Sequence, residues 1–174
     1  GFEKLYSQGL SISTPFNPDY QIAALNSLRL GIEEYDKRKG WRGPITNVSS
    51  NSNWKKTIDK INLDKTLDWK VAQVLKVNEY ISEVEFIDNQ KKVKILFENL
   101  KWTGKKSFNE LLEIGDLIFL KKNKNKIWEL KQMPLVNGGI IVMDPYSGEV
   151  KALVGGYSYV SSEFNRVTQA KRQP

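Results

Sequence analysis

The sequence contains no cysteine and no histidine among its 174 residues. Without cysteine the chain forms no disulfide and carries no thiol nucleophile. Without histidine it lacks the commonest metal ligand and the commonest general base at neutral pH. A transition-metal site or a Ser-His-Asp triad built within this chain is therefore excluded, and we expect no metal and no cofactor.

Long apolar runs are also missing. No stretch approaches the roughly 18 consecutive apolar residues of a membrane span, and the first residues lack the basic-then-apolar order of a signal peptide. We therefore expect any membrane anchor or export signal to lie outside this stretch of sequence. Hydrophobic residues make up 40% of the chain and aromatic residues 11%, which indicates a folded globular protein rather than a disordered one.

Arginine is absent from the centre of the chain. Between Trp54 and Met133 there are 17 lysines and no arginine against 12 acidic residues, in a protein of formal net charge +7. Positive charge permits attraction to nucleic acid, to an anionic membrane or to an anionic wall polymer. Lysine lacks the planar fork with which arginine reads bases. A solvated, lysine-rich surface is the other interpretation of this charge.

The strongest helix signal lies in the first 44 residues. Asn17 is a typical N-cap, Pro18 suits the first turn, and Asp19 complements the helix dipole. A glycine, Gly40, suits the end of the helix. We predict a helix over about residues 18–38, preceded by a short strand over Leu10–Ser13. The buried face of the helix is expected to consist of the apolar residues at spacings of three and four: Ile22, Leu25, Leu28, Ile32 and Tyr35.

The middle of the chain changes from a polar connection to strands. Residues 45–66 are rich in Asn, Ser and Lys, which indicates a surface connection with one short element around Trp54. Residues 67–134 contain short alternating runs, which are typical of strands. Five strands are predicted, at Trp69–Val77, Tyr80–Ile87, Val93–Phe97, Leu117–Lys121 and Ile127–Leu130. Alternation in the first places one set of side chains on the same face: Trp69, Val71, Gln73, Leu75 and Val77.

A short helix is predicted between the third and fourth strands. Ser107–Leu112 has a start that resembles a capping box, and Ile114–Asp116 suits a turn back into strand. Three strands, a short helix and two more strands is the order of a small OB-type barrel, a fold that often binds oligonucleotides or oligosaccharides. Aromatic residues could form such a binding platform or fill the core; the candidates are Trp69, Tyr80, Phe86, Phe97, Trp102 and Trp128.

A β-hairpin is predicted near the C-terminal end. Two apolar runs, Gly138–Met143 and Val150–Val154, flank a turn in which Pro145 fixes φ and Gly148 tolerates positive φ. The expected fold is therefore mainly β with one long helix. A small OB-like five-stranded barrel is inserted between the helical linker and the C-terminal hairpin.

Three blocks of the sequence resemble class A penicillin-binding proteins, and specifically the penicillin-binding protein 1A group. Residues Gly139–Gly156 resemble the opening hairpin of the transpeptidase domain. Residues Gly9–Thr14 and Tyr35–Pro44, together with Gln21 and Ala24, resemble the linker that joins the glycosyltransferase to the transpeptidase. The last eleven residues, FNRVTQAKRQP, resemble the run that leads into the active-site serine of the family motif GSxxK.

The resemblance implies a division of the chain into four parts. These are an interdomain linker at residues 1–44, a connection at 45–66, an OB-like domain at 67–134 and the truncated start of a transpeptidase domain at 135–174. In the family, the serine attacks the penultimate D-alanine carbonyl of a stem peptide, and β-lactams trap the acyl-enzyme. Since that serine would lie beyond Pro174, we expect the parent to be an enzyme and this chain to contain no catalytic residue. The residues expected beside the active site are Gln169, Lys171, Arg172, Gln173 and Pro174.

The resemblance also implies a place and partners for the parent protein. It would be a single-pass membrane protein on the periplasmic side of the bacterial inner membrane, acting in cell-wall assembly and cell shape. It would bind peptidoglycan stem peptides and β-lactams, and so bear on antibiotic resistance. The OB-like part is expected to be a docking surface for a regulatory protein or a spacer.

Two further expectations concern what the chain itself binds. The alternative function is an OB-fold module for single-stranded nucleic acid, supported by the net charge and the strand order. It is opposed by the arginine-free centre and the flanking motifs, so we expect no nucleic acid. The C-terminal hairpin is expected to self-associate through its unpaired edge and apolar face.

Overall fold

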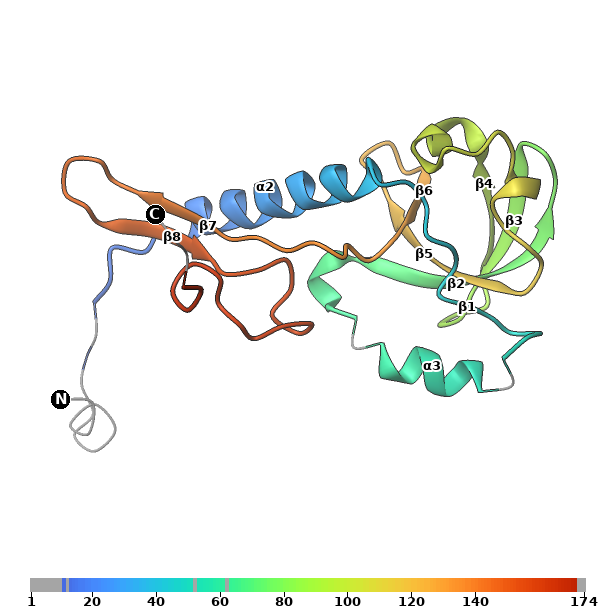
Figure 1. The fold of residues 1–174 in the computed structure, drawn as a ribbon, viewed down its shortest axis with the longest axis horizontal. Coiled ribbons are helices and arrows are strands. Elements are labelled where there is room, and N and C mark those ends of the chain that lie inside the picture. Colours follow the sequence, from blue (N-terminus) through green and yellow to red (C-terminus); the bar gives the residue numbers. More distant parts are fainter. Residues whose placement is uncertain (1–10, 12, 52, 62, 172–174) are drawn as a thin grey trace.

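The computed structural model describes residues 11, 13–51, 53–61 and 63–171. It is mainly β, with a 20-residue helix, a six-stranded antiparallel sheet and a separate two-stranded hairpin (Figure 1). In the expected strand over Leu10–Ser13, Leu10 and Ile12 lie outside the described residues. Ser11 and Ser13 have no strand conformation, because no described strand pairs with them. None of the helices in the described ranges is long and apolar enough to span a membrane.

The long helix, α2, spans Pro18–Lys37. As predicted, the side chain of Asn17 caps it, because its Oδ1 accepts the backbone N–H groups of Asp19 and Tyr20 at 2.9 and 3.1 Å. At the other end, the N–H of Gly40 donates to the carbonyl of Lys37, and Gly40 has φ +80°. Local sequence signals therefore determine both ends of this helix.

The buried face of α2 differs from the expected apolar stripe. Ala24, Ile32 and Asp36 are buried, whereas Ile22 and Tyr35 are 59% and 42% exposed. The reason is that α2 has two packing partners along its length: the C-terminal hairpin at its first half and the six-stranded sheet at its second half (Figure 1). The predicted apolar stripe assumed that one surface covers the whole length of the helix.

The six-stranded sheet holds the predicted strands with small shifts of their ends. Its order is β1-β5-β2-β3-β4, and β6 also pairs with β5. The strands are β1 (Thr46–Asn47), β2 (Trp69–Val77), β3 (Ile81–Phe86), β4 (Lys92–Leu96), β5 (Asp116–Lys122) and β6 (Trp128–Lys131). The polar connection before β2 contains the helix α3 (Trp54–Lys60) and the 3-10 turn η1 (Lys65–Leu67).

The short helix predicted at Ser107–Leu112 is present, but it covers only three residues. The segment forms only a 3-10 turn, η3 (Phe108–Glu110), and the Ser107 side chain makes no capping hydrogen bond. A longer 3-10 segment that the sequence did not predict, η2 (Phe97–Thr103), comes before it. Phe97 and Phe108 meet in the core at 5.3 Å between ring centroids. This contact helps to hold η2 and η3 against the core. Because it joins residues eleven positions apart, no local sequence pattern predicts it.

The main core lies on one face of β2 and β5. Ala72 and Val74 of β2 and Ile118 and Leu120 of β5 are fully buried there. The predicted face of β2 is therefore not the face of this core. Trp69 packs on the opposite side, against Phe119 and the helix. The register shifts between Val74 and Lys76, and this bulge returns Val77 to the main core.

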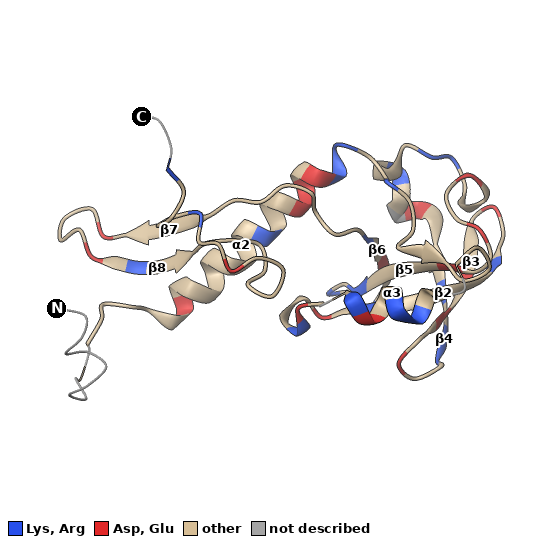
Figure 2. Ribbon diagram, turned by 60° about the horizontal axis from the view of Figure 1, so that its bottom comes forward, with Lys and Arg blue, Asp and Glu red and all other residues tan. Residues whose placement is uncertain are grey.

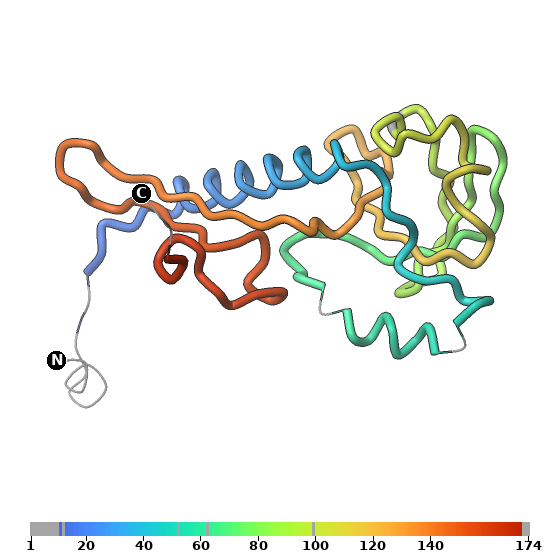
Figure 3. Tube along the Cα trace, in the orientation of Figure 1, coloured from blue at the N-terminus to red at the C-terminus, as the bar shows by residue number. Residues whose placement is uncertain are grey.

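The hairpin consists of β7 (Ile140–Met143) and β8 (Val150–Val154). Its turn follows the prediction, because Asp144 Oδ1 accepts the N–H groups of Tyr146 and Ser147 at 2.9 Å. One face of the hairpin packs on α2, and the other leaves Ile141 and Met143 43% and 51% exposed. Figure 3 shows that the chain between β6 and β7 runs back along α2, which brings the hairpin beside the start of the helix.

Candidate functional site

The second half of α2 carries three charged residues on one face: Arg29, Glu33 and Asp36. Their spacing of four and three places them in neighbouring turns of the same side. Figure 2 shows acidic residues in this half of the helix, followed directly by basic residues at its end. Each of the three contacts residues from distant parts of the chain. We call these three residues and their partners the helix joint.

Glu33 is the centre of the helix joint. Its Oε1 accepts the hydroxyl of Tyr157 at 2.8 Å, and its Oε2 accepts the ammonium of Lys131 at 3.0 Å. The Lys131 and Glu33 side chains are only 10% and 13% exposed. Burial raises the pKa of Tyr157, and the charge of Glu33 raises that pKa further. Tyr157 therefore remains a neutral phenol that donates to the carboxylate.

Arg29 fixes the connection before β2 against the segment after β8. Its Nη2 donates to Asp64 Oδ2 at 2.9 Å and to Thr66 Oγ1 at 2.8 Å, and its Nε donates to the carbonyl of Tyr157 at 3.0 Å. Burial by itself would raise the pKa of Asp64. Two hydrogen bonds from Thr66 and the charge of Arg29 outweigh it, so that pKa is lowered. Asp64 therefore remains a carboxylate.

Asp36 is 2% exposed and accepts hydrogen bonds from two separate segments, at Arg42 and at residues 132–135. Arg42 binds both carboxylate oxygens at 3.0 and 2.9 Å, Gln132 Nε2 donates at 2.9 Å, and the N–H of Leu135 donates at 3.2 Å. A buried charge with this many donors is well compensated. Asp36 therefore holds the end of the helix against the chain that leaves β6.

The helix joint is suited to holding parts of the chain in place and not to bond-making chemistry. Its carboxylates are occupied by cations and donors, and its phenol is held neutral. Within the described residues, no cluster of three or more acidic side chains is arranged to hold a metal ion. Apart from Arg42, which is six positions from Asp36, its partners lie 35 to 128 positions from the helix residue that they contact.

The residues expected beside an active site are only partly described. Gln169 is bonded twice to Asn165: its Oε1 accepts the N–H of Asn165 at 2.7 Å, and its own N–H donates to the Asn165 carbonyl at 2.8 Å. Lys171 is exposed. Arg172, Gln173 and Pro174 lie outside the described residues.

Sequence reasoning missed the residues that seat this C-terminal segment. Asn165 Oδ1 accepts the N–H groups of Val167 and Thr168 at 3.0 and 3.3 Å. The segment lies directly on two glycines: Cβ atoms built at Gly139 and Gly155 would meet Val167 and Asn165. The glycine pairs at 138–139 and 155–156 were the available signal, because adjacent glycines often mark a close backbone approach.

Half of the six candidate aromatic residues lie in the core. Trp69, Phe86 and Phe97 are 9% exposed or less, so their rings cannot stack on a ligand. Trp102 and Trp128 are half-buried, and each has a lysine ammonium 5.6 Å from its ring centroid. Tyr80 is 62% exposed. The packing interpretation therefore holds for the three buried rings.

The chain is similar to a known family of protein domains. The family model of the penicillin-binding protein OB-like domain matches residues 41–136, more than half of the chain. The chain therefore belongs to the family of penicillin-binding protein OB-like domains.

Individual relatives narrow the assignment to one group. The chain is 43% identical to penicillin-binding protein 1A of Rickettsia felis and 26% identical to penicillin-binding protein 1A of Pseudomonas aeruginosa. These matches cover 99% and 97% of this chain and 22% of each relative. The predicted membership of the penicillin-binding protein 1A group of class A proteins is confirmed.

A solved structure supports the fold. The crystal structure of penicillin-binding protein 1A from Haemophilus influenzae superposes with a TM-score of 0.73 at 24% identity, over 97% of this chain and 26% of that one. The chain thus spans about a fifth of the length of the curated relatives that it matches.

Proposed function

We propose that this chain is a non-catalytic connecting part of a peptidoglycan synthase. In the proposed parent, a serine beyond Pro174, assisted by a lysine three positions later, attacks the penultimate D-alanine carbonyl of a stem peptide. The terminal D-alanine leaves, and the acyl group passes from the serine to an amine of a neighbouring strand. The chain contributes no group to these steps and instead holds in place the segment that leads to them. Membership of the penicillin-binding family supports this assignment.

Between the two roles expected of the OB-like part, we propose the spacer role. The observation that carries it is the double engagement of Glu33. One helix carboxylate binds Lys131 of strand β6 and Tyr157 of the segment after β8. The same helix packs on the hairpin through Ala24, which lies against Ala152 and Val154. A helix fixed in this way at both ends transmits the position of the OB-like part to the start of the transpeptidase part.

The spacer role is tested in the full-length parent with Glu33→Gln. The amide keeps the size of the side chain but removes the charge that Lys131 pairs with, so the joint loosens. We expect acylation by a fluorescent penicillin to slow about three- to tenfold, while glycan polymerisation by the same preparation is unchanged. The matched control is Glu34→Gln, which changes an exposed neighbour and should leave both activities at the unsubstituted level.

The possible results separate the parts of the proposal. A parent that a fluorescent penicillin does not acylate at all would contradict the synthase assignment. Normal acylation in Glu33→Gln would contradict the spacer role and leave the assignment standing. Equal slowing in Glu34→Gln would show that the loss of a negative charge, and not the joint, is responsible.

A further inference from the structure

Three lysines of the OB-like part form ion pairs with acidic residues of a neighbouring strand or turn. On β2, β3 and β4, Lys76 lies 4.0 Å from Glu83, and Lys92 lies 3.8 Å from Glu85. Lys70 lies 2.7 Å from Asp88 at the β3–β4 turn. Opposite charges placed across strands stabilise a sheet and cancel one another's field. The surface of β2, β3 and β4 therefore has little net charge, although it contains several lysines.

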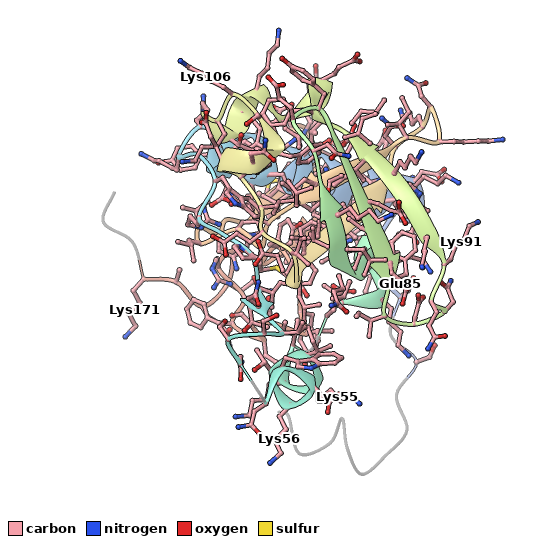
Figure 4. The ribbon with its side chains drawn as sticks, turned by 90° about the vertical axis from the view of Figure 1, so that its right-hand side faces the viewer. Lys55, Lys56, Glu85, Lys91, Lys106 and Lys171 are labelled. Carbon is pink, nitrogen blue, oxygen red and sulfur yellow. The ribbon has the colours of Figure 1, made fainter. Side chains whose placement is uncertain are left out.

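A second set of lysines lies where the end of α2 touches the end of η2. A Cβ built at Gly40 would lie 3.9 Å from the carbonyl oxygen of Thr103, so the residues on either side of these two positions are gathered together. We call this set the lysine corner: Lys37, Lys39, Lys101, Lys105 and Lys106. Four of the five are exposed, and Lys37 is half-buried. Figure 4 shows Lys106 projecting from the body of the molecule.

The lysine corner makes no close ion pair in the part of the chain that the structure describes. Among the described residues, no ion pair within 4.0 Å joins any of its five ammonium groups to a carboxylate. Glu110 lies close by, but its carboxylate accepts the backbone N–H of Lys106 at 3.4 Å. Asp36, on the last turn of α2, is occupied by Arg42. The four exposed lysines therefore carry their charge at the surface without a close acidic partner in the described ranges.

An aromatic pair lies within the corner. The ammonium of Lys37 lies 5.6 Å from the centroid of the Trp102 ring, and Trp41 meets Trp102 edge-on at 6.0 Å. Burial lowers the pKa of Lys37 and the charge of Lys131 lowers it further, while the charges of Glu129, Glu33 and Glu34 act in the opposite direction. A cation that is partly desolvated and repelled by a neighbour gains more from an anionic partner than a fully solvated cation does.

We propose that the lysine corner binds the carboxylates of peptidoglycan, as a contact to the wall polymer that is separate from acyl transfer. This inference rests on the proposed function, which places the chain beside that polymer. The carboxylates of stem peptides are spaced along a glycan strand, and flexible lysines can follow such spacing without the fixed fork of arginine. The half-buried Trp102 ring adds an apolar surface beside these charges. A base-stacking ligand fits less well, because Trp69, Phe86 and Phe97 are in the core.

The test is co-sedimentation of the 174-residue chain with isolated peptidoglycan sacculi at increasing salt. We expect the chain to bind, with affinity that falls as salt rises. The corner variant Lys37→Gln/Lys105→Gln/Lys106→Gln should bind at least tenfold more weakly. The matched control, Lys76→Gln/Lys92→Gln/Lys94→Gln, removes the same formal charge from the strand side and should stay within about twofold of the unsubstituted chain.

Further variants and ligands keep the result interpretable. Because Lys37 packs on Trp102, the double variant Lys105→Gln/Lys106→Gln tests the same surface through two exposed residues alone. Equal loss in the corner and control variants would overturn the proposal, because net charge alone would then explain binding. Undiminished binding to sacculi whose carboxyl groups have been amidated would overturn it too. So would retention by poly-glutamate or single-stranded DNA without binding to sacculi. None of these results bears on penicillin acylation in the parent, which tests the proposed function separately.

Discussion

The hydroxyl of Tyr157 donates a 2.8 Å hydrogen bond to the carboxylate of Glu33, which lies 124 positions earlier in the chain. Lys131 binds the other oxygen of the same carboxylate. One side chain of α2 thereby connects the six-stranded sheet with the segment that follows the hairpin. The first prediction concerns this bond.

Tyr157→Phe removes only the hydroxyl. We expect the free energy of unfolding to fall by about 1 kcal/mol, because Glu33 loses one donor but keeps Lys131. Urea denaturation of the chain measures the change. Tyr159→Phe is the matched control, since Tyr159 is 71% exposed and its hydroxyl should contribute nothing measurable. Equal stability of the two variants would mean that the Tyr157 bond is not formed in solution.

Two aspartates distinguish a buried ion pair from an exposed one. Asp36→Ala should lower the free energy of unfolding by about 3 kcal/mol, because Arg42 and Gln132 lose a buried carboxylate and keep only the carbonyls of Met133 and Gly40 as acceptors. Asp88→Ala breaks the exposed pair with Lys70, in which Asp88 is 55% exposed, and should cost less than about 1 kcal/mol. The comparison is made by chemical denaturation at one pH and ionic strength. A loss at Asp88 as large as that at Asp36 would contradict it.

Stability should decrease in acid partly through Asp64. Its pKa is lowered in the folded chain, because the hydrogen bonds from Thr66 and the charge of Arg29 outweigh the effect of burial. A lowered folded pKa stabilises the protein above the unfolded value, about 3.9 for aspartate, and this stabilisation disappears as pH falls through the folded pKa.

The variant Asp64→Asn should therefore be less stable than the unsubstituted chain at pH 7, and the difference should shrink below about pH 4. Thermal melting between pH 2.5 and 7 measures both. Asp59→Asn, at an exposed position of α3, is the control and should track the unsubstituted chain. A difference that stays constant over this range would show that Asp64 does not titrate with a lowered pKa.

Two glycines should respond to alanine with opposite signs. A Cβ at Gly155 would overlap the Asn165 side chain and lie 2.9 Å from its Cα. Gly155→Ala should therefore cost about 1–3 kcal/mol and displace the C-terminal segment. A Cβ at Gly31, in the middle of α2, meets nothing within 4 Å, so Gly31→Ala should stabilise the helix by about 0.5–1 kcal/mol. Melting temperatures that shift in the same direction would contradict this assignment of the two glycines.

Local patterns predicted much of the secondary structure. The strands Trp69–Val77 and Val150–Val154 have the predicted bounds, because alternation along a strand and turn residues after it are properties of neighbouring positions. The Asn17 cap follows from the residue and the two N–H groups next to it. Alternation in the first strand separated its two faces, but it could not predict that Trp69 and Val71 pack towards the helix while Ala72 and Val74 enter the main core.

The sequence by itself determined where the chain turns, where α2 begins and which family its motifs resemble, because each of these depends on residues a few positions apart. Only the tertiary structure decided what α2 holds together. By spacing alone, the charged residues Arg29, Glu33 and Asp36 match an ordinary solvated helix face. In the folded chain they bind residues from distant segments: Asp64, Lys131, Gln132 and Tyr157. The same holds for Gly155, whose close contact is with Asn165, ten positions later. Contacts between residues far apart in the chain depend on how the folded elements pack, and no local spacing encodes them.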